Sequence, residues 1–295
     1  MPFPGIIPAV TTPFDAAGAI DVPALEANLS ALLQAGVHGF VANGTMGEAG
    51  SLTTAERRLV IETTVRAADG RVPVIVGVSS GTPATSIAYA ADAAAAGADA
   101  VMLLPPLGYR ADPRETVAFY RAVGEASALP VMAYNNPEAS GVDMPATLIA
   151  RIAAEVEQVV AIKECSGDAR RIAALRSAAP ELDVLVGGDD WALEGFAAGA
   201  TGWVTGVADC APAECVELYD TCRGGDFERA RAVYARLLPL ARLDMTPKLV
   251  QFFKGAQDRL GFTGGPVRAP RLALDAADTE ILDAAVAALR APVAA

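Results

Sequence analysis

Short apolar runs alternate with longer alanine-rich stretches along the first two thirds of the chain. The runs are rich in β-branched residues and too short for helices, so they predict buried strands, whereas the alanine-rich stretches predict helices. The predicted strands cover 6–10, 39–42, 72–78, 100–104, 130–134, 159–163, 184–187 and 202–205. The predicted helices between them cover 22–35, 53–69, 82–96, 113–127, 145–155, 168–178 and 189–198.

This alternation of strands and helices predicts an α/β fold with a parallel sheet covered by helices. Eight such units fit a closed (β/α)8 TIM barrel. The main alternative is an open doubly wound sheet, but no GxGxxG sequence follows a strand to favour it. The strand pattern stops after residue 206. We therefore expect a barrel carrying the active site over 1–210 and a C-terminal helical extension over 211–295, with helices at 211–222, 226–241, 246–260 and 276–290 and a loop at 263–272.

Composition narrows the classes of function. The chain has 295 residues, 53% of them hydrophobic, and a net charge of −12, so it can build a large core but lacks the basic surface that nucleic acids or anionic membranes require. No apolar run reaches the roughly 18 residues of a membrane span, and no secretory signal is evident. Four cysteines without CxxC spacing and one histidine favour neither a disulfide framework nor a zinc site. We expect a cytoplasmic enzyme with reduced cysteines.

Lys163 is the first candidate for chemistry. The apolar residues 159–162 before it and the Ser-Gly-Asp sequence at 166–168 place it at the C-terminal tip of a buried strand. Burial disfavours the ammonium form, so we expect the pKa of Lys163 to be lowered. A neutral amine can attack a carbonyl and form a Schiff base. The alternative is a surface lysine at a strand end.

Active sites of TIM barrels lie at the C-terminal ends of the strands, so other side chains there are candidates too. The turn at 44–47 offers backbone N–H groups of Thr45 and Met46 that suit a carboxylate, although glycine-rich turns are routine. Tyr134 is a candidate proton shuttle, or else a core tyrosine with a satisfied hydroxyl.

Asp189 and Asp190 could suggest a metal site. Neighbours along a strand point to opposite faces, so we prefer one of them as a helix N-cap. His38 precedes a predicted strand rather than following one, so we do not expect it to be catalytic, and acid–base work would fall to Tyr, Lys, Asp or Glu. We expect no metal and no organic cofactor.

Four motifs at these strand ends carry a family resemblance. They are GTMGE at 44–48, YN at 134–135, IKE at 162–164 and GGDD at 187–190. In this order and spacing, over about residues 4–240, the chain resembles the dihydrodipicolinate synthase / N-acetylneuraminate lyase family of class I Schiff-base lyases. The resemblance implies a (β/α)8 barrel that assembles as a homo-oligomer, a tetramer or a dimer, and acts on a small 2-oxo acid or imine acid.

The resemblance also implies roles for individual residues. Lys163 would form the Schiff base and Tyr134 would relay protons. Thr45 would hydrogen-bond Tyr134, and the backbone N–H groups of Thr45 and Met46 would hold the substrate carboxylate. Gly188 and Val204 would line the lysine pocket.

Three positions depart from the synthase pattern. Ala139 stands where the synthase has an arginine that holds the second substrate's carboxylate, and Met46 replaces the second threonine of GTTGE. In the synthase, a neighbouring subunit also lends a tyrosine to the site. The corresponding position falls near Gly108 in this chain, and Tyr109 is the tyrosine close to it. These departures count against dihydrodipicolinate synthase activity.

Stretches such as YNNP at 134–137 and KECSGDARRI at 163–172 look most like the Δ1-pyrroline-4-hydroxy-2-carboxylate deaminase branch. The first hypothesis is therefore this deaminase. The alternatives are an aldolase or dehydratase of 2-keto-3-deoxy sugar acids, dihydrodipicolinate synthase itself, and a non-catalytic ligand-binding barrel.

Overall fold

All eight predicted strands form in the computed structural model, which describes residues 3–291. Each strand boundary lies within two residues of its prediction. The strands are β1 (Gly5–Pro8), β2 (Phe40–Ala42), β3 (Val74–Gly77), β4 (Ala100–Leu103), β5 (Val131–Asn135), β6 (Val159–Glu164), β7 (Asp183–Val186) and β8 (Gly202–Thr205).

The strands are parallel and close into a barrel. Consecutive strands pair from β2 to β8, and β8 pairs with β1. A bridge between Ala9 and Val41 joins β1 to β2 and completes the circle. In the pair of β5 and β6, Tyr134 lies directly opposite Lys163. The chain is therefore a (β/α)8 TIM barrel, as its pattern predicts.

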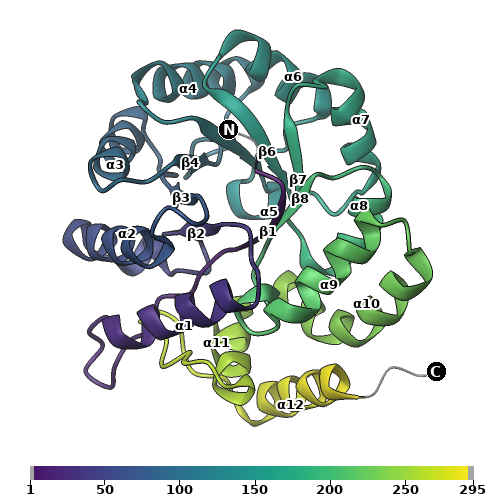
Figure 1. The fold of residues 1–295 in the computed structure, drawn as a ribbon. Helices are drawn as coiled ribbons and strands as arrows, with labels where there is room; N and C mark the ends of the chain where they lie inside the picture. Colours follow the sequence, from purple (N-terminus) through teal and green to yellow (C-terminus); the bar gives the residue numbers. More distant parts are fainter. Residues whose placement is uncertain (1–2, 292–295) are drawn as a thin grey trace.

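Helices surround the strands (Figure 1). Local signals account for where several of them begin. Thr53 and Asp112 accept hydrogen bonds from the backbone of the first turn, each in a capping box with a glutamate three residues later. The helices of this ring are α1 (Val22–Gln34), α2 (Thr54–Ala68), α3 (Pro83–Ala95), α4 (Pro113–Ala126), α6 (Ala146–Glu155), α7 (Arg170–Ala178) and α8 (Ala192–Ala197). Between β5 and α6 lies the short helix α5 (Pro137–Ser140), which the sequence pattern did not predict.

The C-terminal part is helical, as expected. Its helices are α9 (Pro212–Arg223), α10 (Phe227–Ala241), α11 (Leu249–Leu260) and α12 (Ala276–Arg290), with the 3-10 turn η4 (Arg242–Met245) between α10 and α11. Figure 1 shows α10, α11 and α12 grouped beside α1 and α9 at one side of the barrel. The helix α9 packs against β1 and α8, and so occupies the eighth place of the ring. The division at residue 210 stays a prediction.

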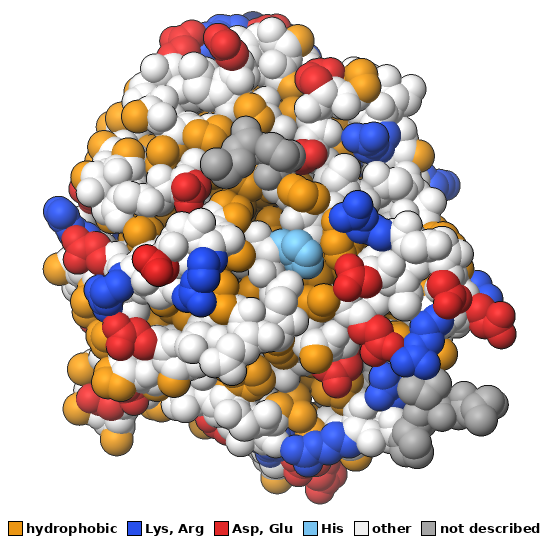
Figure 2. Space-filling view, in the orientation of Figure 1, with side chains coloured by type: hydrophobic (Ala, Val, Ile, Leu, Met, Phe, Trp, Pro, Cys, Tyr) orange, Lys and Arg blue, Asp and Glu red, His pale blue; other side chains and the backbone are white. Residues whose placement is uncertain are grey.

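The face on which the strands begin carries scattered charges of both signs around His38 (Figure 2). The ring of His38 accepts a hydrogen bond from the Ile6 backbone at 3.2 Å and contacts Tyr219 edge-on. It therefore lies at the end of the barrel opposite to Lys163. From residue 3 to residue 291, no helix is long and apolar enough to cross a membrane.

Candidate active site

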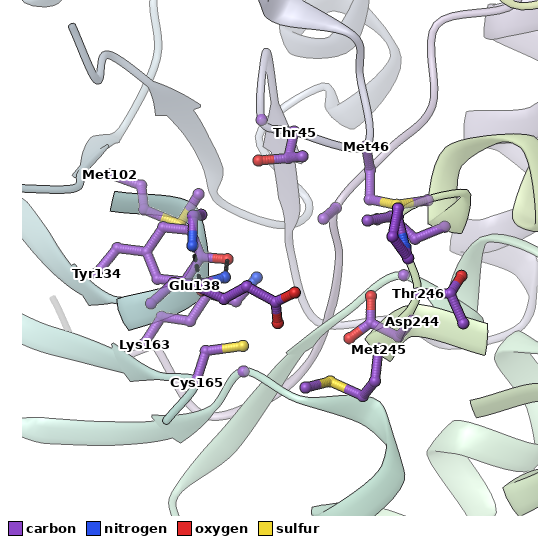
Figure 3. A pocket seen from close by; sticks show the side chains of 18 residues that line it. Thr45, Met46, Met102, Tyr134, Glu138, Lys163, Cys165, Asp244, Met245 and Thr246 are labelled. Carbon is purple, nitrogen blue, oxygen red and sulfur yellow. Dashed lines mark hydrogen bonds between the residues drawn. The ribbon is translucent and has the colours of Figure 1, made fainter. Parts of the chain in front are cut away.

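Lys163 projects from β6 into a cavity of about 220 Å³ at the C-terminal end of the barrel (Figure 3). The residue is only 7% exposed, and its Nζ lies 4.5 Å from the centre of the Tyr134 ring. Among the described residues, the amine makes no hydrogen bond and no ion pair within the usual distance limits. A buried amine without a fixed partner is free to react with a ligand that enters the cavity.

The turn after β2 forms the opposite wall. Thr45 and Met46 both line the cavity. Within residues 3–291, neither of their backbone N–H groups donates to another protein group. Two adjacent free donors facing a cavity suit a carboxylate.

A buried ion pair holds this turn in place. Glu48 adopts a left-handed backbone conformation, with φ of 52°, and is 1% exposed. It accepts a hydrogen bond from Lys254 Nζ of α11 at 2.7 Å and another from the Arg268 backbone at 3.0 Å. The C-terminal segment thereby fixes the conformation of the loop that carries Thr45 and Met46.

Tyr134 lines the cavity beside Lys163, but the expected bond from Thr45 to its hydroxyl is not among those formed by the described residues. The Tyr134 hydroxyl instead accepts a hydrogen bond from Asn136 Nδ2 at 3.0 Å. Burial raises the pKa of Tyr134 to about 12, although the nearby Lys163 charge opposes the rise. The phenol is therefore protonated at neutral pH and is suited to donate a proton.

The pKa of Lys163 departs from the expectation. Burial acts to lower it, but Tyr134, Cys165 and Asp244 in their charged forms act to raise it, and the net direction is upward. The sequence pattern indicated the burial but not the acidic neighbours. At neutral pH the Tyr134 and Cys165 side chains, each with a pKa of about 12, are uncharged, so Asp244 is the neighbour whose charge favours the ammonium there, and the amine must lose a proton before it attacks.

Asp244 is a cavity residue that the sequence pattern did not reveal. It belongs to η4, and its Oδ2 accepts a hydrogen bond from the Asp189 backbone at 3.4 Å. Burial raises the pKa of Asp244 to about 6, while Lys163 opposes this shift. A lone aspartate among the helices of the C-terminal segment gave no local sign of its position.

The Asp189 carboxylate hydrogen-bonds to other parts of the protein and is not available to a ligand. Its side chain is fully buried and accepts hydrogen bonds from Trp203 Nε1 at 3.0 Å, from the Gly206 backbone at 3.2 Å and from the Val207 backbone at 2.8 Å. The prediction that Asp189 or Asp190 caps the following helix is wrong, because the N-cap of α8 is Trp191 without a side-chain hydrogen bond and the Asp189 carboxylate binds the turn after β8. In the part of the chain described, no three His, Cys, Asp or Glu side chains are arranged to hold a metal ion.

The family resemblance also points to Gly188, Val204 and Tyr109 as residues of the site. Gly187, rather than Gly188, lines the cavity, and a Cβ atom on Gly187 would lie 2.9 Å from Lys163 Cε. Val204 is fully buried in β8 and Tyr109 is 50% exposed, and neither lines this cavity. The cavity does include Glu138 and Ala139 of α5, so the position without arginine faces the site.

Comparison with known proteins agrees with this geometry. The model of the dihydrodipicolinate synthetase family matches residues 2–289. A 4-hydroxy-tetrahydrodipicolinate synthase from Methanothrix thermoacetophila is 37% identical over 91% of this chain and 90% of its own. One from Hyphomonas neptunium is 37% identical over 97% of this chain and 98% of its own. A dihydrodipicolinate synthase from Acinetobacter baumannii, solved in complex with pyruvate, has a TM-score of 0.92 and 29% identity, covering 97% of this chain and 99% of that one.

The family match and the relatives, on a barrel of this fold, identify the class of protein as a class I Schiff-base lyase. The chain belongs to the dihydrodipicolinate synthetase family, since the family match spans nearly all of it. The family expected from the four motifs is thereby confirmed.

Proposed function

We propose that Lys163 forms an imine with C2 of a 2-oxo acid and that Tyr134 moves protons to and from the reacting atoms. The observation that carries this proposal is the buried, unpaired amine over the Tyr134 ring. The free N–H groups of Thr45 and Met46 would hold the substrate carboxylate. Pyruvate is the simplest such substrate, and the Acinetobacter baumannii synthase was solved in complex with it.

In the proposed reaction, the Lys163 nitrogen gives up a proton, adds to C2 of the carbonyl and gives up a second one; both protons end on the departing oxygen, so the ammonium and the carbonyl yield a protonated imine and one water. The imine withdraws electrons and eases loss of a proton from C3. Tyr134, whose phenol is protonated at neutral pH, would donate its proton to the departing oxygen and then take back a proton from the Lys163 nitrogen. Each step uses only protein side chains and substrate atoms.

Borohydride trapping tests the imine directly. The chain contains only three lysines, Lys163, Lys248 and Lys254, so the modified peptide identifies the reactive one. With pyruvate, we expect one reduced adduct on the peptide of Lys163 and none in Lys163→Ala. Lys248→Ala is the matched control and should keep the adduct, because Lys248 lies outside the cavity. An adduct that persists in Lys163→Ala would contradict the assignment.

For the overall reaction, the names of the relatives support 4-hydroxy-tetrahydrodipicolinate synthase over the deaminase that the sequence motifs favour. In this reaction, C3 of the pyruvate enamine would join the aldehyde of a four-carbon amino-acid semialdehyde, with loss of one water overall. The deaminase and the sugar-acid aldolase or dehydratase are the second candidates. They are favoured by one observation, that Ala139 gives the cavity no arginine for a second carboxylate.

Product analysis separates these reactions. The synthase consumes pyruvate only when the semialdehyde is present. The deaminase releases ammonia from the hydroxylated pyrroline, and the aldolase releases pyruvate from a 2-keto-3-deoxy acid. Ammonia release without pyruvate consumption would favour the deaminase over the synthase.

We also propose that the protein is a homo-oligomer. The half-exposed Tyr109 side chain, close to where the family resemblance places a tyrosine lent between subunits, supports this. Light scattering coupled to gel filtration measures the mass, and a monomer of 30.2 kDa would contradict the proposal.

A further inference from the structure

We infer that Asp244 selects substrates whose far end, beyond the imine-forming carbon, carries hydroxyl or amino hydrogen-bond donors, and that it disfavours a second carboxylate there. The inference rests on the imine-forming step of the proposed function, because Lys163 must hold the near end of the substrate, and it favours the deaminase or sugar-acid candidates over the synthase. It concerns the part of the cavity that lies between Asp244 and Glu138.

The first argument is the position of the two carboxylates. In Figure 3, Glu138 reaches into the cavity from the side of Tyr134 and Lys163, and Asp244 faces it from the other side. A substrate tied to Lys163 and longer than pyruvate would extend into the space between them. These side chains would then contact its fourth and fifth carbon atoms.

The second argument is the bonding of Asp244. Its Oδ2 atom is held by the Asp189 backbone N–H at 3.4 Å. Its Oδ1 atom has no hydrogen-bond partner among residues 3–291, although the side chain is only partly exposed. One oxygen is thus anchored and the other is open to a donor from the ligand, which is how a protein fixes the orientation of a bound hydroxyl.

The third argument is charge. Of the residues that line the cavity, only Lys163 is basic, whereas Glu138 and Asp244 are acidic. Once Lys163 has formed the imine, no second cation is present for a distal carboxylate. Such a group would lose its hydration and meet like charges, which a partly enclosed site makes costly.

The pH dependence should follow from the same arrangement. Burial raises the pKa of Asp244 to about 6, and the titratable groups around it are Lys163, Asp189, Asp190, Tyr134 and Cys165, with Glu138 across the cavity. A carboxylate is charged above its pKa, so discrimination against a distal carboxylate should be strong at pH 8 and weaker at pH 5. The wild-type protein alone can reveal this change.

Two compounds of equal chain length provide the test. They are 2-keto-3-deoxypentonate, which ends in two hydroxyl groups, and 2-oxoglutarate, which ends in a carboxylate. Each competes with isotopically labelled pyruvate for borohydride trapping on Lys163. We expect wild-type protein to prefer the hydroxylated acid by about tenfold or more, and Asp244→Asn to reduce this preference by roughly tenfold, as loss of a charged hydrogen bond implies. Glu138→Gln should act in the same direction.

Asp69→Asn is the matched control, since it removes one negative charge at an exposed position that Asn accepts readily. It should keep the wild-type preference. The inference would be overturned by an unchanged preference in Asp244→Asn and Glu138→Gln together with no change between pH 8 and pH 5 in the wild type. That result would leave the proposed function standing. Failure of the wild type to trap any 2-oxo acid would instead overturn the proposed function.

Discussion

At the scale of single residues, the environment decides what Lys163 can do. Its place at a strand end follows from the local sequence, but the direction of its pKa shift does not: burial acts to lower the pKa, charged neighbours act to raise it, and the net direction is upward, with Asp244 the charged neighbour at neutral pH. Burial also keeps the Tyr134 phenol protonated at neutral pH. The site therefore holds an ammonium beside a phenol, and proton transfer between substrate and Tyr134 becomes central to the reaction.

Tyr134→Phe tests this role. We expect kcat to fall by roughly 10²–10⁴-fold, because the variant lacks the hydroxyl that carries the proton while its ring still packs beside Lys163. The borohydride adduct of pyruvate should still form, although more slowly. Steady-state kinetics and adduct mass measure the two effects. A purely structural role for Tyr134 would lower the melting temperature and leave kcat of the folded fraction unchanged.

At the scale of elements, capping signals and hydrophobic period account for where most helices and strands lie. The departures have local causes. The helix predicted at 189–198 begins only at Ala192, because Asp189 turns its carboxylate to the backbone after β8 and residues 189–191 form a 3-10 turn. The helix α5 was missed because Pro137–Ser140 is too short to show a period.

Close packing of β7 on β6 leads to a second prediction. A Cβ atom on Gly187 would lie 2.9 Å from Lys163 Cε and 2.8 Å from the Glu164 carbonyl oxygen. Gly187→Ala should therefore displace the lysine and slow pyruvate trapping by about tenfold or more, at a stability cost of about 1–3 kcal/mol. Gly50→Ala is the control, since its Cβ would meet no atom within 4 Å. Equal trapping rates in the two variants would contradict this account.

At the scale of the whole molecule, ion pairs and hydrogen bonds connect the C-terminal segment to the barrel. Lys254 of α11 reaches Glu48, which lies 206 positions earlier, and Arg268 pairs with Glu56 of α2. The Arg268 guanidinium also lies 4.2 Å from the Phe14 ring centre. These contacts join the barrel and the extension into one body around the turn that carries Thr45.

The pair of Arg268 and Glu56 predicts how stability responds to acid. Hydrogen bonds from Arg268 hold the pKa of Glu56 at about 2. Because the folded pKa is lowered, the pair stabilises the protein above the unfolded pKa of about 4.3 and this contribution is lost as pH falls toward 2. Arg268→Gln should be less stable than wild type at pH 7 and should lose less stability between pH 4.5 and pH 2.

Urea unfolding at several pH values measures this difference. Arg66→Gln is the control, because the ion pair of Arg66 with Glu26 has both side chains about half exposed and should contribute little. If Arg268→Gln and wild type lose the same stability over that pH range, the pair does not act as described.

The sequence by itself determined the eight strands, most of the helices and the strand-end positions of Lys163 and Tyr134, because hydrophobic period and capping are local properties. Only the tertiary structure decided that Asp244 enters the cavity, that Lys254 holds Glu48, and that the pKa of Lys163 moves upward. Electrostatic and packing interactions depend on distance in space, and barrel closure brings together residues that no local pattern connects.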